Sequence, residues 1–133
     1  MTKAIKINHV TLLVKDKNKA EKFYTEILEL EKHVVGDSLW IRVGDQFIHI
    51  TEDSGESRKN SFYHFAIEFE NVVEHIKKLI EKGVKVFDLD KELNEILVNT
   101  EFENPERQFF IRDIDGNLIE LIEANNQFFN PVE

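Results

Sequence analysis

Three histidines and one glutamate stand at matching positions of an internal repeat, and together they have the chemistry of a metal site. His9 and His64 fall in the first expected strand of each half, and His49 and Glu120 fall in the last. Neutral imidazole binds Zn, Ni, Fe or Mn, and a carboxylate adds compensating charge. His9, His64 and Glu120 alone would form a facial triad with open positions for water, substrate or O2. His49 is either a fourth ligand or a nearby base or substrate contact.

The repeat that relates these residues can be followed along the chain. Residues 8–11 (NHVT) align with 63–66 (YHFA) at an offset of 55 residues. Residues 44–50 (GDQFIHI) align with 115–121 (DGNLIEL) at an offset of 71 residues. The additional 16 residues fit an insertion within 88–106, an acidic stretch. Two segments agree independently, which is better evidence for a repeat than a single motif.

The first half has the pattern β-α-β-β-β. Alternating apolar residues predict a strand over 5–14, and Asp16 is the expected N-cap of a helix whose apolar stripe ends near Leu30. Two short strands, 39–43 and 47–51, are expected to form a hairpin around a Gly-Asp-Gln turn. A polar loop is expected at 52–60.

The second half restarts the same pattern with a strand over 62–69. Asn71 and Glu74 resemble a capping box, and Gly83 is the expected C-terminal cap of the following helix. The remaining strands are expected at 84–87, at 96–98 and, as a hairpin around Asp115-Gly116-Asn117, over 108–122. Residues 125–133 read as a tail.

Strand alternation also predicts where the four metal-type side chains point. Each lies on the face opposite the apolar residues of its own strand, so two halves of equal curvature would direct all four into one cavity. The cavity would also receive Thr11, Phe47, Phe62, Gln108, Phe110, Arg112 and Leu118. Of these, we expect Thr11, Phe47, Gln108, Phe110 and Arg112 to contact substrate. Plain core packing is the alternative for the aromatic residues, and His33 and His75, which lack repeat partners, are expected at the surface.

Composition removes several classes of function. The 133 residues include 17 basic and 26 acidic side chains, a formal net charge of −9, and no cysteine. Such a charge repels nucleic acid and anionic lipid, and the absence of cysteine excludes disulfides, thiolate metal sites and a cysteine nucleophile. No apolar run approaches the ~20 residues needed to span a bilayer. Without the apolar stretch of a secretory signal, a cytoplasmic domain is expected.

Three segments resemble the vicinal oxygen chelate superfamily, which includes glyoxalase I, fosfomycin and bleomycin resistance proteins, methylmalonyl-CoA epimerase and extradiol dioxygenases. They are INHVTLLVKD with EKFYTEILEL, then SFYHFAIEF, then FFIRDIDGNLIELIE. The resemblance covers about residues 5–124. It implies an α+β fold in which two tandem βαβββ modules, about 5–52 and 61–124, form one domain over 1–133. The modules would enclose a U-shaped metal-binding cleft, and small members usually dimerise.

The resemblance assigns His9, His64 and Glu120 as metal ligands, with His49 at a fourth position. Glu120 or His49 would act as a catalytic base beside a divalent Zn, Ni, Mn or Fe ion. The implied activity is that of a metal-dependent lyase, isomerase, thiol transferase or dioxygenase acting on a small oxygenated molecule. The alternative is a small-molecule sequestering protein of the bleomycin-resistance type. Members of that type need no metal and usually lack these histidines, so the histidines favour catalysis.

Departures from individual members leave the reaction open. Glyoxalase I has an arginine where this chain has Leu13. Thr11 matches the fosfomycin enzymes, which supports a fosfomycin-resistance-like thiol transferase as a further alternative. The stretch 99–108 (NTEFENPERQ) counts against this alternative, because it has three glutamates and only one arginine where those enzymes hold a phosphonate. The metal site could form within one chain or between the two subunits of a homodimer.

Overall fold

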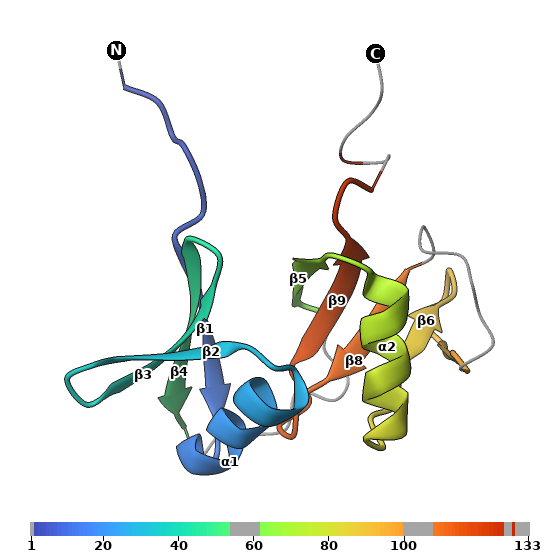
Figure 1. Ribbon diagram of the computed structural model, residues 1–133, viewed down its shortest axis with the longest axis horizontal. Coiled ribbons are helices and arrows are strands. Elements are labelled where there is room, and N and C mark those ends of the chain that lie inside the picture. Colours follow the sequence, from blue (N-terminus) through green and yellow to red (C-terminus); the bar gives the residue numbers. More distant parts are fainter. Residues whose placement is uncertain (1, 54–61, 100–107, 127–128, 130–133) are drawn as a thin grey trace. The chain divides into compact units, whose positions relative to one another are not determined.

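The computed structural model describes residues 2–53, 62–99, 108–126 and 129. Its contacts divide the chain into two compact units, Met1–Ser57 and Arg58–Glu133. Figure 1 shows that each unit combines strands with helix, so the expected α+β class is confirmed. Most of the expected loop at 52–60 and residues 100–106 of the acidic stretch 88–106 lie outside the described residues.

The first unit is a four-stranded sheet with one helix. Its strand order is β1-β4-β3-β2, with β1 parallel to β4 and the other pairs antiparallel. Its elements are β1 (His9–Val14), α1 (Lys17–Lys22) continued by a π-helical turn η1 (Phe23–Ile27), β2 (Glu31–Val35), β3 (Ser38–Val43) and β4 (Gln46–Glu52).

The second unit repeats this topology with one strand more. Its strand order is β5-β9-β8-β6-β7, and β5 is parallel to β9. Its elements are β5 (His64–Phe69), α2 (Val72–Glu81), β6 (Phe87–Leu89), β7 (Glu95–Leu97), β8 (Phe109–Arg112) and β9 (Leu118–Glu123). Strand β6 therefore takes the place of β2, and β7 is an added outer strand. It falls where the change of repeat offset places the insertion, which confirms two βαβββ modules.

The helices begin at equivalent caps, as the sequence predicts. The Asp16 carboxylate accepts hydrogen bonds from the backbone N–H groups of Asn18 (2.9 Å) and Lys19 (3.1 Å). Asn71 Oδ1 accepts from the backbone N–H of Glu74 at 3.4 Å. The Glu74 carboxylate accepts from the side-chain amide of Asn71 rather than from its backbone, so the capping box is altered.

A carboxylate from the last strand of each unit also holds the start of the helix. Glu52 of β4 accepts a hydrogen bond from the backbone N–H of Lys17 (3.0 Å). Glu123 of β9 accepts from the backbone N–H groups of Asn71 (3.0 Å) and Val72 (3.3 Å). Because Glu123 takes the backbone N–H of Asn71, Glu74 turns to the side chain instead. The two glutamates are related by the 71-residue offset, so the repeat extends to individual hydrogen bonds.

Each sheet buries one face beneath its helix, and this leaves the opposite face for other uses. In the first unit the buried set is Leu12, Val14, Ala20, Phe23, Tyr24, Leu28, Leu39, Ile41, Ile48 and Ile50. In the second unit it includes Ile67, Val72, Ile76, Leu79, Phe109, Ile111, Ile119 and Leu121. The second unit also buries part of its other face, where Phe87, Phe110 and Leu118 form a separate cluster. These alternating sets confirm the parity that the sequence predicts.

Three details differ from the sequence predictions. Strand β1 begins at His9 rather than at residue 5, because its parallel partner β4 starts at Gln46, level with Asn8, and does not extend alongside residues 5–7. Strand β2 has no alternating apolar pattern, since it is an edge strand with four of its five residues exposed. The first helix is short and ends in the π-helical turn instead of running to Leu30.

The insertion in the second unit is organised by one aspartate between β6 and β7. Asp90 accepts hydrogen bonds from the backbone N–H groups of Asn94 (2.8 Å) and Glu92 (2.9 Å). These bonds hold the pKa of Asp90 below its ordinary value, because they stabilise the charged carboxylate. The bond from the Asn94 backbone has the largest effect. The turn therefore returns the chain to form the outer strand.

Candidate functional site

The face of the first sheet opposite α1 carries its metal-type side chains in two rows. Residues opposed across neighbouring strands share a face, so each row runs across the whole sheet. We call this the histidine face. Its first row is His9, Phe47, Arg42 and Glu31, and its second row is Thr11, His49, Trp40 and His33.

His9 is held in a defined tautomer by the residue before it. Its Nδ1 lies 2.8 Å from the side-chain oxygen of Asn8. Because an amide oxygen only accepts hydrogen bonds, Nδ1 carries the proton in the neutral imidazole and Nε2 keeps its lone pair. A neutral imidazole whose second nitrogen donates to a fixed acceptor is the usual state of a metal-binding histidine. His9 is exposed, which leaves Nε2 accessible.

His49 is packed against an aromatic ring in the same row. Its imidazole stacks on the indole of Trp40, with ring centres 4.2 Å apart and an angle of 10° between the planes. His9 meets the same indole edge-on at 4.9 Å, so Trp40 contacts both histidines. The contact depends on the hairpin register that sets Trp40 opposite His49.

The spacing of His9 and His49 bears on whether both bind one ion. Their ring centres are 6.3 Å apart and the planes are 79° apart. With metal–nitrogen bonds of about 2.1 Å, ring centres would lie about 4.6 Å apart for ligands at 90° and about 6.4 Å apart for ligands at 180°. As placed, the two rings could share an ion only from opposite sides. This spacing favours His49 as a base or substrate contact over a ligand adjacent to His9.

His64 and Glu120 face each other across β5 and β9 in the second unit. His64 Nε2 lies 3.3 Å from Glu120 Oε1, and the two side chains are 24% and 14% exposed. The other ring nitrogen of His64, Nδ1, lies 2.8 Å from the backbone carbonyl of Phe62 and donates to it. In neutral His64 the Nε2 lone pair would therefore face the carboxylate, and a proton or a metal ion between the two atoms would remove the repulsion.

The separation of this pair fits two ligands of one metal ion. With bonds of about 2.1 Å, ligand atoms are about 3.0 Å apart at 90° and about 3.4 Å apart at the tetrahedral angle. The observed 3.3 Å between His64 and Glu120 falls within this range. Phe110 packs edge-on against His64 at 5.6 Å and is itself buried with Phe87 and Leu118. An apolar surrounding of this kind strengthens electrostatic binding.

The other residues predicted to bind substrate differ in their surroundings. Thr11 is exposed beside His49, and Phe47 is half-buried beside His9. Gln108 is exposed and precedes β8. Arg112 lies on the face of His64 and donates to the carbonyl of Gly116 at 2.9 Å, and its guanidinium also approaches the carboxylate of Glu95 at 3.7 Å.

The two histidines without repeat partners are not simple surface residues. His33 is half-buried and packs against Phe47, with ring centres 5.2 Å apart. His75 stacks on Phe69 at 4.2 Å. Within residues 2–53, 62–99, 108–126 and 129, no three His, Cys, Asp or Glu side chains lie together as a metal site would require. The structure brings His64 and Glu120 together in one unit and places His9 near His49 in the other.

The sequence matches one protein family over most of its length. The profile of the Glyoxalase/Bleomycin resistance protein/Dioxygenase superfamily matches residues 6–121. No curated protein matches the sequence. In the part of the chain that the structure describes, no helix has the length and apolar character needed to cross a membrane.

Solved structures with the same fold cover nearly the whole chain. A glyoxalase family protein from Bacillus anthracis is 24% identical with a TM-score of 0.69, and the match covers 93% of this chain and 99% of that one. The fosfomycin resistance protein FosX from Listeria monocytogenes, complexed with Mn(II) and sulfate, is 21% identical with a TM-score of 0.67 and 94% coverage of both chains. A FosX variant complexed with Mn(II) and 1S,2S-dihydroxypropylphosphonic acid is 23% identical with a TM-score of 0.64 and 90% coverage of both.

Proposed function

Because the chain belongs to the Glyoxalase/Bleomycin resistance protein/Dioxygenase superfamily, we propose that it is a divalent-metal-dependent enzyme acting on a small oxygenated molecule. In this proposal His9, His64 and Glu120 are the metal ligands, and His49 is a base or substrate contact near them. The reaction is a lyase, isomerase, transferase or dioxygenase reaction. The metal is Zn, Ni, Mn or Fe, and Mn(II) has precedent in the FosX structures.

One observation carries the proposal, namely the arrangement of His64 and Glu120. In the neutral form of His64, two groups that both accept hydrogen bonds face each other at 3.3 Å, and the carbonyl of Phe62 occupies the only other nitrogen of the imidazole. A divalent cation satisfies both groups at the bond lengths that such ligands prefer. His9, oriented by Asn8, supplies the third ligand and the second imidazole nitrogen.

The side chains around these ligands suggest how the chemistry would be divided. A bound ion would act as a Lewis acid on two neighbouring substrate oxygens. Glu120 could accept a proton at Oε1 or Oε2, and His49 could accept one at a ring nitrogen while the stack on Trp40 fixes its plane. Thr11, next to His49 in register, could donate its hydroxyl hydrogen to a substrate oxygen. Phe110 excludes water from the side of His64 that it covers.

A FosX-like reaction is the second candidate, because FosX structures are among the solved structures with this fold. FosX is a fosfomycin resistance protein of the same fold, and one of its structures holds a dihydroxypropylphosphonic acid. Thr11, two residues after His9, supports the comparison from the sequence. The three glutamates at 101, 103 and 106 oppose it, because they would repel a phosphonate.

The proposed activity is tested by a screen with reconstituted metal. The chain, purified without a histidine tag, is loaded in turn with Zn, Ni, Mn and Fe. It is then offered methylglyoxal–thiol adducts, fosfomycin with and without thiols, methylmalonyl-CoA and catechols. We expect turnover with one class, lost at least 100-fold in Glu120→Gln and retained in His75→Ala. Turnover that survives chelation and Glu120→Gln would contradict the proposal.

We also propose that the chain forms a homodimer. Outer strands β2 and β7 present exposed apolar side chains, among them Val34, Val35, Ile96 and Leu97. Unpaired strand edges of this kind are usually covered in stable proteins. Light scattering at micromolar concentration should give twice the chain mass of 15.7 kDa. A monomer mass would contradict this expectation.

A further inference from the structure

The first row of the histidine face contains an arginine, Arg42, that is placed to bind an anion. Arg42 is exposed, and its Nε donates to the backbone carbonyl of Gly44 at 3.0 Å. Its guanidinium carbon lies 6.0 Å from the centre of the Phe47 ring, so the ring supports the cation. Within the described residues, no carboxylate lies at ion-pairing distance from Arg42. The bond to Gly44 fixes the side chain and leaves the two terminal amino groups for a ligand.

Three aromatic rings, those of Trp40, Phe47 and His33, lie near Arg42 on the histidine face. Trp40 and Phe47 meet edge-on, with centres 6.0 Å apart, and His33 lies beside Phe47 at 5.2 Å. All three rings are half-buried, so part of each remains accessible from the histidine face. A flat apolar group laid on this face would bury ring surface that the unit itself leaves uncovered.

His9 and Arg42 lie in the same row of the histidine face. His9 and Arg42 are separated by one intervening strand, at two strand spacings of about 4.8 Å each. Phe47 lies between the two residues in the row, so a flat group that contacts this ring lies next to both His9 and Arg42.

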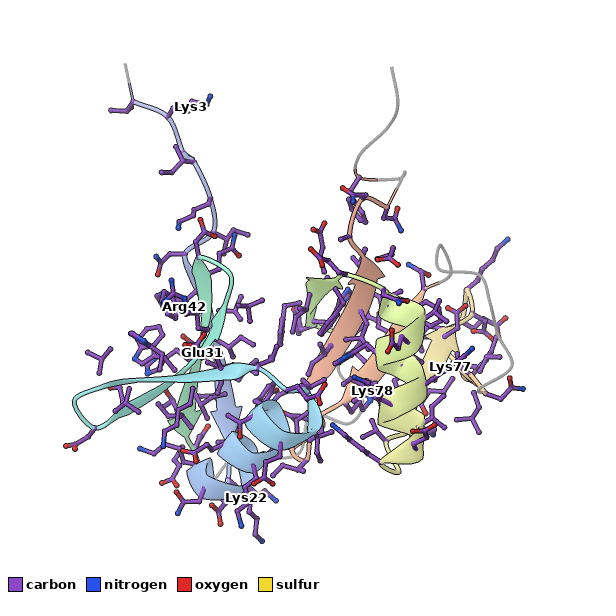
Figure 2. The ribbon with its side chains drawn as sticks, in the orientation of Figure 1. Lys3, Lys22, Glu31, Arg42, Lys77 and Lys78 are labelled. Carbon is purple, nitrogen blue, oxygen red and sulfur yellow. The ribbon has the colours of Figure 1, made fainter. Side chains whose placement is uncertain are left out.

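We propose that Arg42 binds a carboxylate of the substrate, at the end away from the oxygens that approach the metal. This inference rests on the proposed function, and it adds a substrate class: flat molecules with two neighbouring oxygens at one end and a carboxylate at the other. The planar guanidinium matches a carboxylate through two parallel hydrogen bonds. Glu31 is the cross-strand neighbour of Arg42 (Figure 2), and the chain carries a charge of −9. A single negative charge is therefore accepted more easily than the double charge of a phosphate or phosphonate.

The repeat provides an internal comparison for this assignment. Arg112 is the counterpart of Arg42. Arg42 lies opposite Phe47 of β4, which pairs with His9 of β1. Arg112 lies opposite Leu118 of β9, which pairs with His64 of β5. Arg112, however, lies 3.7 Å from Glu95, which supplies a carboxylate from within its own unit. Of the two arginines, Arg42 is the one that keeps its charge for a ligand.

The test compares two ligands that differ in one group, a carboxylate in one and a neutral amide in the other. Isothermal titration calorimetry of the zinc-loaded chain measures binding of 3,4-dihydroxybenzoate and of its neutral analogue 3,4-dihydroxybenzamide. We expect the acid to bind about tenfold more tightly than the amide, as a charge-assisted bidentate pair would give. Arg42→Gln should abolish that preference while the affinity for the amide changes less than about twofold. Lys22→Gln removes an exposed cation from α1, on the other side of the sheet (Figure 2), and should keep the preference.

Each other outcome has a definite meaning. Zinc binding with equal affinities for acid and amide, or with neither ligand bound, overturns the assignment of Arg42 and leaves the proposed metal site standing. A preference that survives Arg42→Gln, or an equal loss of both ligands in that variant, also overturns it. Failure of the wild-type chain to bind zinc overturns the proposed function and this inference together.

Discussion

At the scale of single residues, the ligand-type histidines are oriented by groups outside the metal site. His9 donates its Nδ1 proton to the side chain of Asn8, and His64 donates its own to the backbone carbonyl of Phe62. Both bonds leave Nε2 as the ring nitrogen that could bind a metal ion. Only the bond from His9 to Asn8 can be removed by mutation, because its acceptor is a side chain. A substitution of Asn8 therefore tests whether this orienting bond matters for metal binding.

Asn8→Ala should weaken metal binding about tenfold without abolishing it. The imidazole of His9 would lose the acceptor that fixes its tautomer and plane, and orienting groups of this kind contribute about 10–100-fold to metal affinity. Competition with a chelator of known affinity measures the change. Asn18→Ala, which removes an exposed amide from α1, serves as the matched control. Equal affinities for the Asn8 variant and the wild-type chain would show that His9 is not oriented in this way.

At the scale of elements, the two units use the same device to join helix and sheet. A glutamate at the end of the last strand accepts hydrogen bonds from the first turn of the helix, as Glu52 does once and Glu123 does twice. A carboxylate at this place also interacts favourably with the helix dipole. The parallel strand pair and the helix of each unit are thereby fixed relative to each other.

Glu123→Ala should lower the free energy of unfolding by about 1–2 kcal/mol, as the loss of a helix cap does. Glu52→Ala should cost less, about 0.5–1 kcal/mol, because only one backbone N–H loses its acceptor. Urea titration followed by circular dichroism measures both variants. If Glu52→Ala lowered the free energy of unfolding as much as Glu123→Ala or more, the number of hydrogen bonds to the helix would not determine the loss of stability.

Sequence patterns predicted the elements best where local chemistry determines them. Asp16 and Asn71 cap the helices because their side chains reach backbone N–H groups in the next turn, and this depends on local sequence alone. Strand β2 was not assigned individually, because its charged residues Glu31 and Lys32 do not give the pattern of a strand. Pairing with β3 stabilises it as an edge strand. The stack of Trp40 on His49 was missed for a related reason, because it depends on hairpin register rather than on residue type.

The candidate site divides in the same way. Equivalence within the repeat selected His64 and Glu120, and the structure brings them to 3.3 Å. The orienting contacts from Asn8 and the Phe62 carbonyl leave no periodic signal in the sequence. That all four metal-type residues meet in one U-shaped cleft stays a prediction.

At the scale of the whole molecule, the chain consists of two units with one topology. We predict that they unfold together as a single domain over residues 1–133. Trp40 is the sole tryptophan and lies in the first unit, whereas circular dichroism reports on both units. Urea transitions followed by tryptophan fluorescence and by circular dichroism should therefore coincide. An earlier fluorescence transition would mean that the first unit unfolds independently.

The most direct test of the account is the number of metal ions that each chain binds. Protein without a histidine tag is titrated with Zn(II) and Mn(II) in a calorimeter, and the bound metal is measured by elemental analysis after dialysis. We predict one ion per chain, lost in His64→Ala and in Glu120→Ala and retained in His75→Ala and His33→Ala. Less than about 0.2 ion per wild-type chain after reconstitution, or full retention in a His64→Ala, Glu120→Ala double variant, would contradict the central claim.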